Sequence, residues 1–499
     1  MRGSMQNRRE FLKTGASTLG AAPLAAAAQP AAAGKKMIGM QVGAVSFVDE
    51  GTDQVLDILQ QRGAVNTLFL ATFTYGRGIA GRQVPGQPLP DHGKQVHDLD
   101  FHGGNYGVVR PQYYKDTGIR PEATRAPDHG SLDIISEVLP KAKARGLKTI
   151  LWTEDVWRYD IPGIEKLQEV DLYGRKVRRM CVNNPYHRNF LTGLVEDYTR
   201  SYDIDGIMWG SERHGALGTA LGANHGGRGS DPGSVGCFCE FCEKKARQEG
   251  NVKIERVKEG YKELERFVRA SRSGQRPVDG YEVTFWRILM RYPEILAWEQ
   301  FWHDGLREIY AAMYAKAHSI KPSMQVGWHI WHNNSFSPFY RAQQDLQPLS
   351  KCSDFLKMVM YHNCGGERMA SYIDSVTGTV YGDLPKQEAL DYHYRVLNCR
   401  ERSYEQIPFT GFSADYVQRE AQRAMDGAAG TKTLIWPGID IDIPTAKNHS
   451  KSTPQGTKDA VMAAFQAGVP GVILSRKYSE MMLANLSGAG DAVREMKLA

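Results

Sequence analysis

The segment from residue 204 to residue 215 carries the first side chain with a clear chemical use, Glu212. It reads IDGIMWGSERHG, a short apolar run without helical spacing that is followed at once by small and charged residues. This pattern predicts a buried parallel strand that presents Glu212 at its carboxyl end. A carboxylic acid held there can donate a proton to a leaving group, and its carboxylate can accept one. The alternative interpretation is a solvated loop glutamate that pairs with Arg213.

Acid–base chemistry at Glu212 needs a second carboxyl group, and two other apolar runs also end in acids. One ends in Glu154 and Asp155, and the other ends in Asp440 and Asp442. Hydrolysis of a glycosidic bond uses one carboxylic acid to protonate the leaving oxygen and a second carboxylate as the nucleophile or as a base for water. All four acids are therefore candidates. Helix capping or a surface ion pair is the alternative role for each of them.

Aromatic and imidazole side chains gather at the ends of the same apolar runs. Sugar rings pack their C–H faces on aromatic faces, while sugar hydroxyls pair with imidazole, amide and guanidinium groups. Successive residues of a strand face opposite sides, so only part of this set can point toward a site. Arg476 can bind an acidic sugar or pair with Glu480. The candidate substrate-binding residues are Trp152, Glu154, Asp155, Trp209, His214, Trp328, His329, His332, Tyr361, His362, Trp436, Arg476 and Tyr478.

The same histidines leave room for a catalytic metal ion. His329, His332 and His362 can in principle gather one together with Asp440. No His-Glu-x-x-His or similar spacing supports this arrangement. A metal-dependent barrel lyase or hydrolase is therefore a secondary hypothesis.

Three of the seven cysteines lie within six residues, in the sequence CFCEFC that starts at residue 237. An odd number of cysteines clustered in this way is a poor disulfide framework, and single-residue spacing would strain a disulfide. Cys237, Cys239 and Cys242, completed by Cys181, are the ligand set expected of a closed, structural zinc site. Three reduced or partly disulfide-bonded thiols are the alternative.

Apolar segments alternate with amphipathic ones along the chain from residue 37. Repeated strand–helix units with glycine at the returns, as at Gly146 and Gly468, are typical of parallel α/β folds. Eight such units predict a (β/α)8 TIM barrel with long insertions after strands 2 and 4, at residues 76–130 and 213–293. A ninth candidate strand, residues 407–412, is interpreted as a loop before a helix capped by Ser413. The predicted strands are residues 37–46, 65–74, 147–153, 204–210, 324–331, 355–361, 432–438 and 471–475, with helices that include residues 53–62, 132–145, 185–201, 298–319 and 479–496.

The order of motifs around the cysteines resembles glycoside hydrolase family 42. The shared features are Cys181 followed by Asn-Asn-Pro, then a helix, a strand that ends in glutamate, and the Cys-x-Cys-x-x-Cys cluster, over about residues 175–245. Members of that family are β-galactosidases with a clan A barrel in which four cysteines hold zinc beside the active site. Two features depart from the pattern, Ser211 in place of an asparagine and a glycine-rich insert at residues 219–235.

This resemblance implies roles for particular residues. Glu212 takes the place of the general acid/base at the end of the fourth strand. The seventh strand holds the nucleophile in that clan, and this chain offers Asp440 or Asp442 there. Glu154 and Asp155 remain a competing pair at the end of the third strand.

Composition and charge argue against several classes of partner. The chain has 499 residues, of which 41% are hydrophobic and 24% charged, an ordinary globular composition. Residues 1–34 carry +3 of the formal net charge of +6, and the small remainder argues against nucleic acid as a partner. No apolar run after the first few dozen residues is long enough to span a membrane. No glycine-rich phosphate loop follows the first strand, so no nucleotide cofactor is expected.

The first 34 residues resemble a twin-arginine export signal. Arg8 and Arg9 precede Phe11 and a weakly apolar, alanine-rich run with Ala-x-Ala cleavage sites before Lys35. The leading MRGS ahead of a second methionine is typical of an expression-vector scar. The signal predicts a periplasmic or secreted protein that folds, and acquires its metal, before export. We therefore expect a tag and signal at residues 1–34 and a catalytic barrel domain at residues 35–499.

Together these features predict an exported glycoside hydrolase that acts on an oligosaccharide or glycoside. A carbohydrate-binding barrel without catalysis is an alternative from a different class, because Ser211 already breaks the family motif. The resemblance also favours assembly into a homo-oligomer.

Overall fold

The computed structural model describes residues 35–75, 80–249, 252–443 and 452–498 of the chain. Lys36–Ala499 group into one compact unit. The expected export signal, residues 1–34, lies outside the described residues. None of the described helices combines the length and the apolar composition that crossing a membrane requires.

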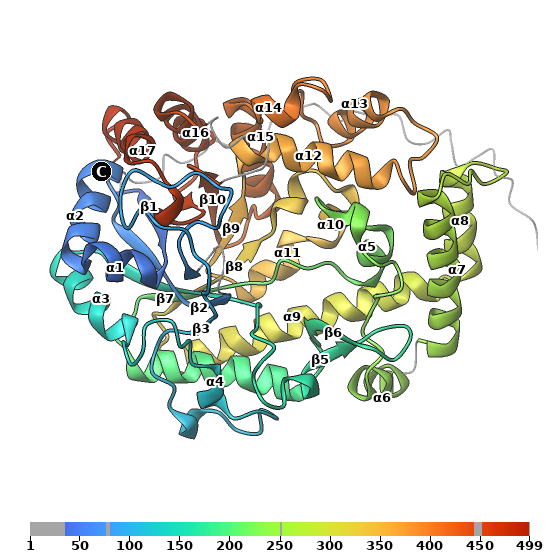
Figure 1. Cartoon of the computed structure of the whole chain (residues 1–499), viewed down its shortest axis with the longest axis horizontal. Helices are drawn as coiled ribbons and strands as arrows, with labels where there is room; N and C mark the ends of the chain where they lie inside the picture. The colour runs from blue at the N-terminus through green and yellow to red at the C-terminus, as the bar shows by residue number, and fades with distance from the viewer. Residues whose placement is uncertain (1–34, 76–79, 250–251, 444–451, 499) are drawn as a thin grey trace, which may run out of the picture. The chain divides into compact units, whose positions relative to one another are not determined.

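Eight parallel strands close into a barrel (Figure 1). Each strand pairs with the next in the order β1, β2, β4, β7, β8, β9, β10 and β11, and β11 pairs back onto β1. Helices connect these strands around the outside, so the predicted (β/α)8 TIM barrel is confirmed. The strands are β1 (Met37–Val42), β2 (Thr67–Tyr75), β4 (Lys148–Glu154), β7 (Gly206–Gly210), β8 (Gln325–Ile330), β9 (Phe355–Val359), β10 (Leu434–Asp440) and β11 (Gly471–Ser475).

The outer helices begin and end where local chemistry predicts. Helix α4 starts at Pro185, behind an Asn184 side chain that accepts a backbone N–H, and it ends at Ser201. It lies beside α9 (Figure 1). The returns at Gly146 and Gly468 have φ angles of +70° and +89°, a region that glycine adopts without strain. The helices are α1 (Ala44–Glu50), α2 (Thr52–Gly63), α3 (Ile134–Ala144), α4 (Pro185–Ser201), α9 (Glu294–Ile320), α12 (His362–Val376), α15 (Ala414–Gly427), α16 (Pro454–Gln466) and α17 (Leu483–Glu495).

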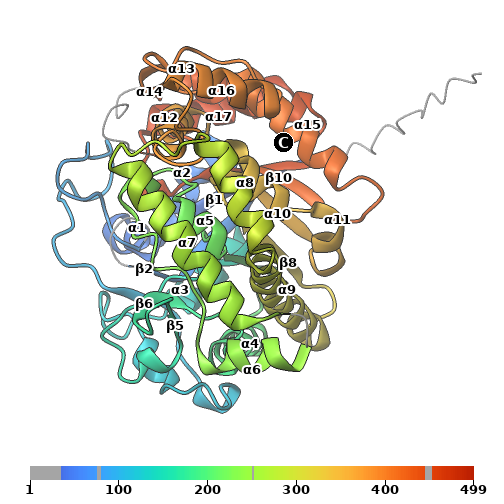
Figure 2. The same cartoon turned by 90° about the vertical axis from the view of Figure 1, so that its right-hand side faces the viewer.

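Long segments interrupt the alternation after β2, β4 and β7. In the first, the short strand β3 (Gly103–Asn105) pairs antiparallel with β2. In the second, β5 (Gln168–Val170) and β6 (Lys176–Met180) form an antiparallel pair. In the third, α7 and α8 lie side by side (Figure 2). The helices of the third segment are α5 (Ala216–Leu221), α6 (Glu240–Glu249), α7 (Ile254–Arg272) and α8 (Tyr281–Arg291).

The ninth candidate strand does not form. Its residues belong to the short helix α14 (Ile407–Thr410), and α15 begins directly after Ser413. Pro408 in the first turn suits the start of a helix and has no N–H to donate to a strand ladder. The remaining connecting helices are α10 (Pro338–Gln343), α11 (Leu346–Leu349) and α13 (Lys386–Val396).

Large apolar side chains form a plug inside the barrel. The rings of Phe355 and Trp436 stack there with their centroids 4.2 Å apart. The plug consists of Phe69, Ala71, Ile150, Trp152, Met208, Phe355, Trp436 and Ile473. Because side chains alternate along a strand and residues in register share a face, the next inward positions toward the carboxyl ends can be assigned, and they are polar on five of the strands. They are Gln41, Glu154, His329, Lys357 and Ser475.

Candidate active site

Glu212 and His329 meet at the carboxyl end of the barrel. His329 Nε2 lies 2.8 Å from Glu212 Oε1. Only 4% of the His329 side chain is exposed, whereas 48% of the Glu212 side chain is, so the carboxylate faces an opening above buried polar groups. Burial lowers the pKa of His329, so its neutral ring donates the Nε2 proton to the carboxylate. Nδ1 of His329 has no hydrogen-bond partner within the described residues, which suits the unprotonated nitrogen.

Glu154 approaches the same site from the end of β4, the neighbour of β7. Burial and the negative charge of Glu212 raise the pKa of Glu154 well above that of an ordinary glutamate. Although its side chain is about half exposed, Glu212 is partly enclosed by the protein, which disfavours its ionisation. The hydrogen bond from His329 and the charge of Arg368 outweigh this and lower the pKa of Glu212. At neutral pH the two carboxyl groups therefore differ, since Glu154 keeps its proton and Glu212 is ionised.

A fully buried lysine, Lys357, belongs to the same polar layer. Its Nζ donates to Gln41 Oε1 and, over 3.0 Å, to the hydroxyl of Tyr361. Ser475 Oγ donates to the same oxygen of Gln41 over 2.7 Å. Burial lowers the pKa of Lys357 to about 7, although the two glutamates favour its ammonium form. The layer therefore holds a titratable amine close to the two acids, whose negative charge favours its ammonium form.

The residues on either side of Glu212 fix its loop. Ser211 Oγ donates to Asp155 over 3.1 Å, and Arg213 Nη2 lies 2.9 Å from the same carboxylate. Arg213 Nη1 donates to the carbonyl oxygen of Met180 over 2.6 Å, at the end of β6. Burial opposes the ionisation of Asp155, but the charge of Arg213 helps to lower its pKa below the ordinary value. Asp155 is therefore an anchor for this loop.

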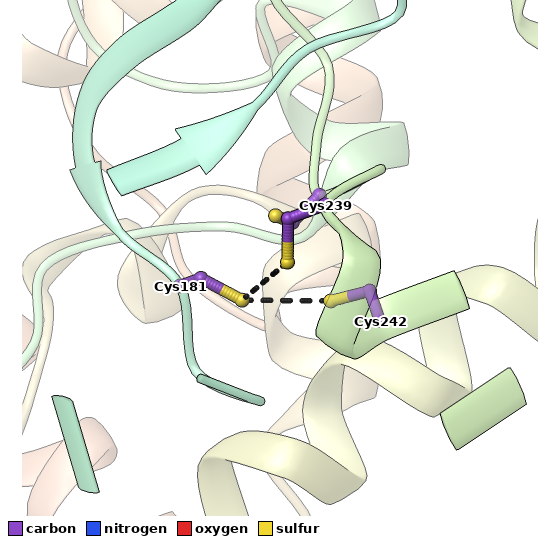
Figure 3. A group of neighbouring side chains, drawn as sticks. Cys181, Cys239 and Cys242 are labelled. Carbon is purple, nitrogen blue, oxygen red and sulfur yellow. Dashed lines mark hydrogen bonds between the residues drawn. The ribbon is translucent and has the colours of Figure 1, made fainter. Parts of the chain in front are cut away.

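Four cysteines lie together directly after the Met180 that Arg213 contacts, and Figure 3 shows three of them, Cys181, Cys239 and Cys242. Sγ of Cys181 is 3.6 Å from Sγ of Cys239 and 3.5 Å from Sγ of Cys242, and the sulfurs of these three and Cys237 all lie within 4.8 Å of one another. All four are buried free thiols. Zinc–sulfur bonds of about 2.3 Å in a tetrahedron place sulfurs about 3.8 Å apart, so the cluster can bind a metal such as zinc. The neighbouring sulfurs lower the pKa of the Cys239 thiol, which favours a thiolate ligand.

The acids of β10 cap helices. Asp440 accepts two backbone N–H groups in the first turn of α12, over 3.0 Å and 2.8 Å. Asp442 accepts the N–H of Met482 over 2.8 Å and the side-chain amide of Asn485 over 2.9 Å, at the start of α17. Both carboxylates therefore cap helices, the role predicted from the sequence as the alternative to catalysis. The catalytic role that the family resemblance implies for one of them stays a prediction.

Four of the candidate tryptophans are packing residues. Trp152 and Trp436 belong to the apolar plug inside the barrel. Trp209 and Trp328 alternate with inward-facing residues and so point outward, where their rings contact Tyr310 of α9 at centroid distances of 5.5 Å and 4.5 Å. Since all four are buried, the structure offers none of them to a substrate.

The histidines do not gather around a second metal. His329 faces the glutamate, His332 Nδ1 lies 3.1 Å from Arg368, and His362 Nδ1 lies 2.8 Å from Asp440. Over the described ranges, the four cysteines are the only group of three or more metal-ligand side chains that converge. The hypothesis of a catalytic metal therefore gains no support from the geometry.

Three further candidates have partners outside the carboxyl pair. His214 packs edge-on against Trp331 with ring centroids 4.9 Å apart, and burial lowers its pKa to about 3. Arg476 pairs with Glu480 over 3.0 Å, which was one of its two expected roles. The hydroxyl of Tyr478 donates to the last residue of α1 over 3.1 Å. Of the candidates, Glu154, Glu212, His329 and Tyr361 are the ones brought together around the polar layer.

The sequence interpretation does not include Lys357, Gln41, Arg368 or His225, although all four contribute to the site. Lys357 carried a usable signal, because it is the one charged side chain in the apolar strand FLKMV. Gln41 is likewise the one polar side chain in MIGMQV. Arg368 lies in α12 and acts on Glu212 through its charge, and His225 lies in the segment after α5, where burial lowers its pKa to about 3. No local pattern marks these two, since only the fold carries them to the barrel opening.

No protein-family profile matches the sequence, and no curated protein matches it. Solved structures do match. A β-galactosidase from the Antarctic haloarchaeon Halorubrum lacusprofundi has a TM-score of 0.51 and 13% identity, over 92% of this chain and 57% of that protein. A family 42 β-galactosidase from G. stearothermophilus, solved as a catalytic mutant, has a TM-score of 0.50 and 10% identity, over 93% of this chain and 57% of that protein. The chain thus spans little more than half the length of either structure, and the similarity establishes the fold.

Proposed function

We propose that the protein is a glycoside hydrolase in which Glu154 and Glu212 are the two catalytic carboxyl groups. The observation that carries this proposal is that Glu154 and Glu212 stand at the carboxyl ends of the paired strands β4 and β7, where their surroundings raise the pKa of the first and lower that of the second. Glycoside hydrolysis requires one proton donor and one carboxylate. The barrel shared with two β-galactosidases supports a glycoside as the class of substrate.

In the proposed reaction, Glu154 donates its proton to the glycosidic oxygen as the bond from that oxygen to the sugar breaks. The Glu212 carboxylate, held by His329, acts on the anomeric carbon directly or through a water that it deprotonates. The family resemblance assigns the acid/base role to Glu212. The electrostatics of this site instead favour Glu154 as the group that carries the proton.

The test compares Glu212→Gln and Glu154→Gln on two kinds of glycoside. We expect Glu212→Gln to lose hydrolysis of both alkyl glycosides and dinitrophenyl glycosides while it still binds sugar. We expect Glu154→Gln to lose alkyl glycosides but to retain dinitrophenyl glycosides, because the dinitrophenolate leaves without a proton. Asp442→Asn is the matched control and is expected to keep wild-type kcat. Wild-type rates in both glutamine variants would refute the proposal, and sugar binding without any hydrolysis by the native protein would favour a binding barrel.

We also propose that Cys181, Cys237, Cys239 and Cys242 hold a structural zinc ion. Four thiolates leave zinc no open position, so the ion would hold the β5–β6 segment and the Glu212 loop together through Arg213. Metal analysis is expected to find about one zinc per chain, and Cys239→Ser to lower both the zinc content and the melting temperature. Purified protein without zinc whose stability equals that of a zinc-loaded sample would contradict this.

Export by the twin-arginine route to the periplasm or outside the cell is proposed from Arg8 and Arg9 in the sequence. Replacing both arginines with lysine in a bacterial host with this pathway is expected to keep the uncleaved precursor in the cytoplasm. Cell fractionation measures this, and unchanged export would rule the route out.

A further inference from the structure

Lys357 is a buried lysine whose amine has no anionic hydrogen-bond partner within the described residues. Its side chain is completely buried, and its Nζ donates to two neutral oxygens, those of Gln41 and Tyr361. Within the described residues, no carboxylate oxygen lies within 4.0 Å of Nζ. Lysine is rarely buried in this way, because removing an ammonium group from water is costly. A lysine buried at this cost is expected to have a function.

The neighbours of Lys357 hold its position closely. A Cβ atom on Gly438 would lie 2.8 Å from Lys357 Cε, so glycine at this position of β10 leaves the space that the lysine stem occupies. The ring of Tyr361 lies 5.5 Å from Nζ and the ring of Trp152 lies 6.0 Å from it. The ammonium group is therefore confined between aromatic rings, above the apolar plug and within the layer that holds Glu154.

The titratable groups that face Lys357 come from four elements. They are Glu154 at the end of β4, Glu212 after β7, His329 of β8, whose pKa the charge of Lys357 helps to lower, and Arg476 after β11. The charges of Glu212, Lys357 and Arg476 in turn shift the pKa of Glu154. Arg476 forms an ion pair with Glu480, so it already has a carboxylate partner. The hydrogen bonds of Lys357 Nζ go to the neutral oxygens of Gln41 and Tyr361, so its ammonium form is the cation of this set that has no hydrogen-bonded carboxylate partner among the described residues.

We propose that Lys357 is a positioning residue for the proton donor, whose fixed ammonium group stabilises the carboxylate that Glu154 becomes when it protonates the leaving oxygen. This inference rests on the proposed function, in which Glu154 is the acid. Burial and the ionised Glu212 both make Glu154 hold its proton tightly, and the charge of Lys357 lowers the pKa of Glu154 against them. The lysine thus keeps Glu154 a strong enough acid to act.

The test is Lys357→Met, which keeps the apolar stem and removes the charge. We expect kcat to fall about 100-fold for alkyl glycosides and to change little for dinitrophenyl glycosides, because only the former need the acid. Activity that needs protonated Glu154 is lost as pH rises through its pKa. Removing the cation raises that pKa, so the alkaline limb of kcat/KM is expected to move upward by about one pH unit or more.

Lys477→Met is the matched control for loss of a buried lysine. Lys477 is also completely buried; its Nζ donates to the carbonyl oxygen of Gly81 over 2.6 Å and lies 3.9 Å from Glu480, the partner of Arg476. We expect this variant to lose stability as Lys357→Met does, but to keep the wild-type dependence on leaving group and on pH. The comparison separates damage to the fold from loss of a charge beside Glu154.

Lys357→Ala with added methylammonium covers the case in which the methionine variant fails to fold. The alanine leaves space for the small cation, which is expected to restore alkyl glycoside hydrolysis, whereas methanol is not. Equal losses on both substrates, an unmoved alkaline limb and no rescue would overturn the inference. Glu154→Gln that hydrolyses alkyl glycosides normally would instead refute the proposed function, so the two failures are distinguishable.

Discussion

Two pairs of acids stand at the carboxyl ends of strands in the same barrel, yet their surroundings differ. Glu154 and Glu212 face each other's charge, an imidazole and a lysine. Asp440 and Asp442, at the end of β10, accept backbone N–H groups from the helices that follow the two neighbouring strands. Asp440 caps the helix after β9, and Asp442 caps the helix after β11.

From this difference we infer that an acid at a strand end is available for catalysis where its oxygens do not accept hydrogen bonds from the first turn of a helix. A carboxylate that accepts backbone N–H groups is stabilised as an anion and has its lone pairs occupied. A carboxylate beside another carboxylate and a neutral histidine keeps an oxygen free, and its pKa is set by its neighbours. The first kind contributes stability, and we assign catalysis to the second kind.

Glu212→Gln is expected to have the largest effect on activity and to distinguish the two pairs of acids most clearly. The change removes the reacting oxygen but no helix cap, so kcat/KM is expected to fall by about 10³-fold or more while the melting temperature stays at the wild-type value. Steady-state kinetics on a dinitrophenyl glycoside and thermal unfolding measure the two effects. A lowered melting temperature with unchanged kcat/KM would show that Glu212, like Asp440 and Asp442, has a structural role.

His329→Leu is expected to have the next largest effect, a fall in kcat/KM of roughly 10- to 100-fold. The carboxylate of Glu212 must be ionised to act, so activity is present above its pKa and is lost as the pH falls through it. Losing the hydrogen bond from His329 raises that pKa, and the acidic limb of the profile is expected to move to higher pH. An acidic limb that stays in place would show that His329 does not control the carboxylate.

Asp440→Asn tests the other side of the comparison. The variant is expected to keep wild-type kcat and to lose about 1–2 kcal/mol of unfolding free energy, because the charged cap of α12 is lost. Burial opposes ionisation of Asp440, but His362 and two backbone N–H groups lower its folded pKa. Its contribution is present above the unfolded pKa and is lost as the pH falls through the folded one. Denaturant unfolding is therefore expected to show that variant and wild type converge in acid, and a constant difference would contradict the assignment.

Asp442→Asn is expected to have the smallest effect, within about 1 kcal/mol of the wild type at pH 7. Burial raises the pKa of Asp442 to about 6. Because this folded pKa lies above the unfolded value, the stability linked to Asp442 is present at low pH and is lost as the pH rises through about 6. The variant removes that pH dependence, which unfolding curves at several pH values measure. A larger loss at pH 8 than at pH 4 would show that the ionised form is the better cap.

Much of the fold was predictable because short stretches of sequence determine its strands and helices. Each predicted strand overlaps a barrel strand, and residues 185–201 form α4 from end to end, since asparagine and proline mark its start. The cysteine spacing likewise predicted a cluster that the structure assembles from Cys181 and residues 237–242. In each case the determining contacts are hydrogen bonds or side-chain periods within a few residues of one another.

The sequence by itself determined the eight strands, the thiol cluster and the presence of a glutamate at the end of β7. The tertiary structure alone decided which acids cap helices. Asp440 and Asp442 accept hydrogen bonds from helices that begin far away in the chain and pack beside β10. The tertiary structure also decided that Lys357 shares a layer with Glu154. Closure of the barrel brings β4 and β9 into one interior, and the electrostatic interaction of two buried groups depends on their distance in space.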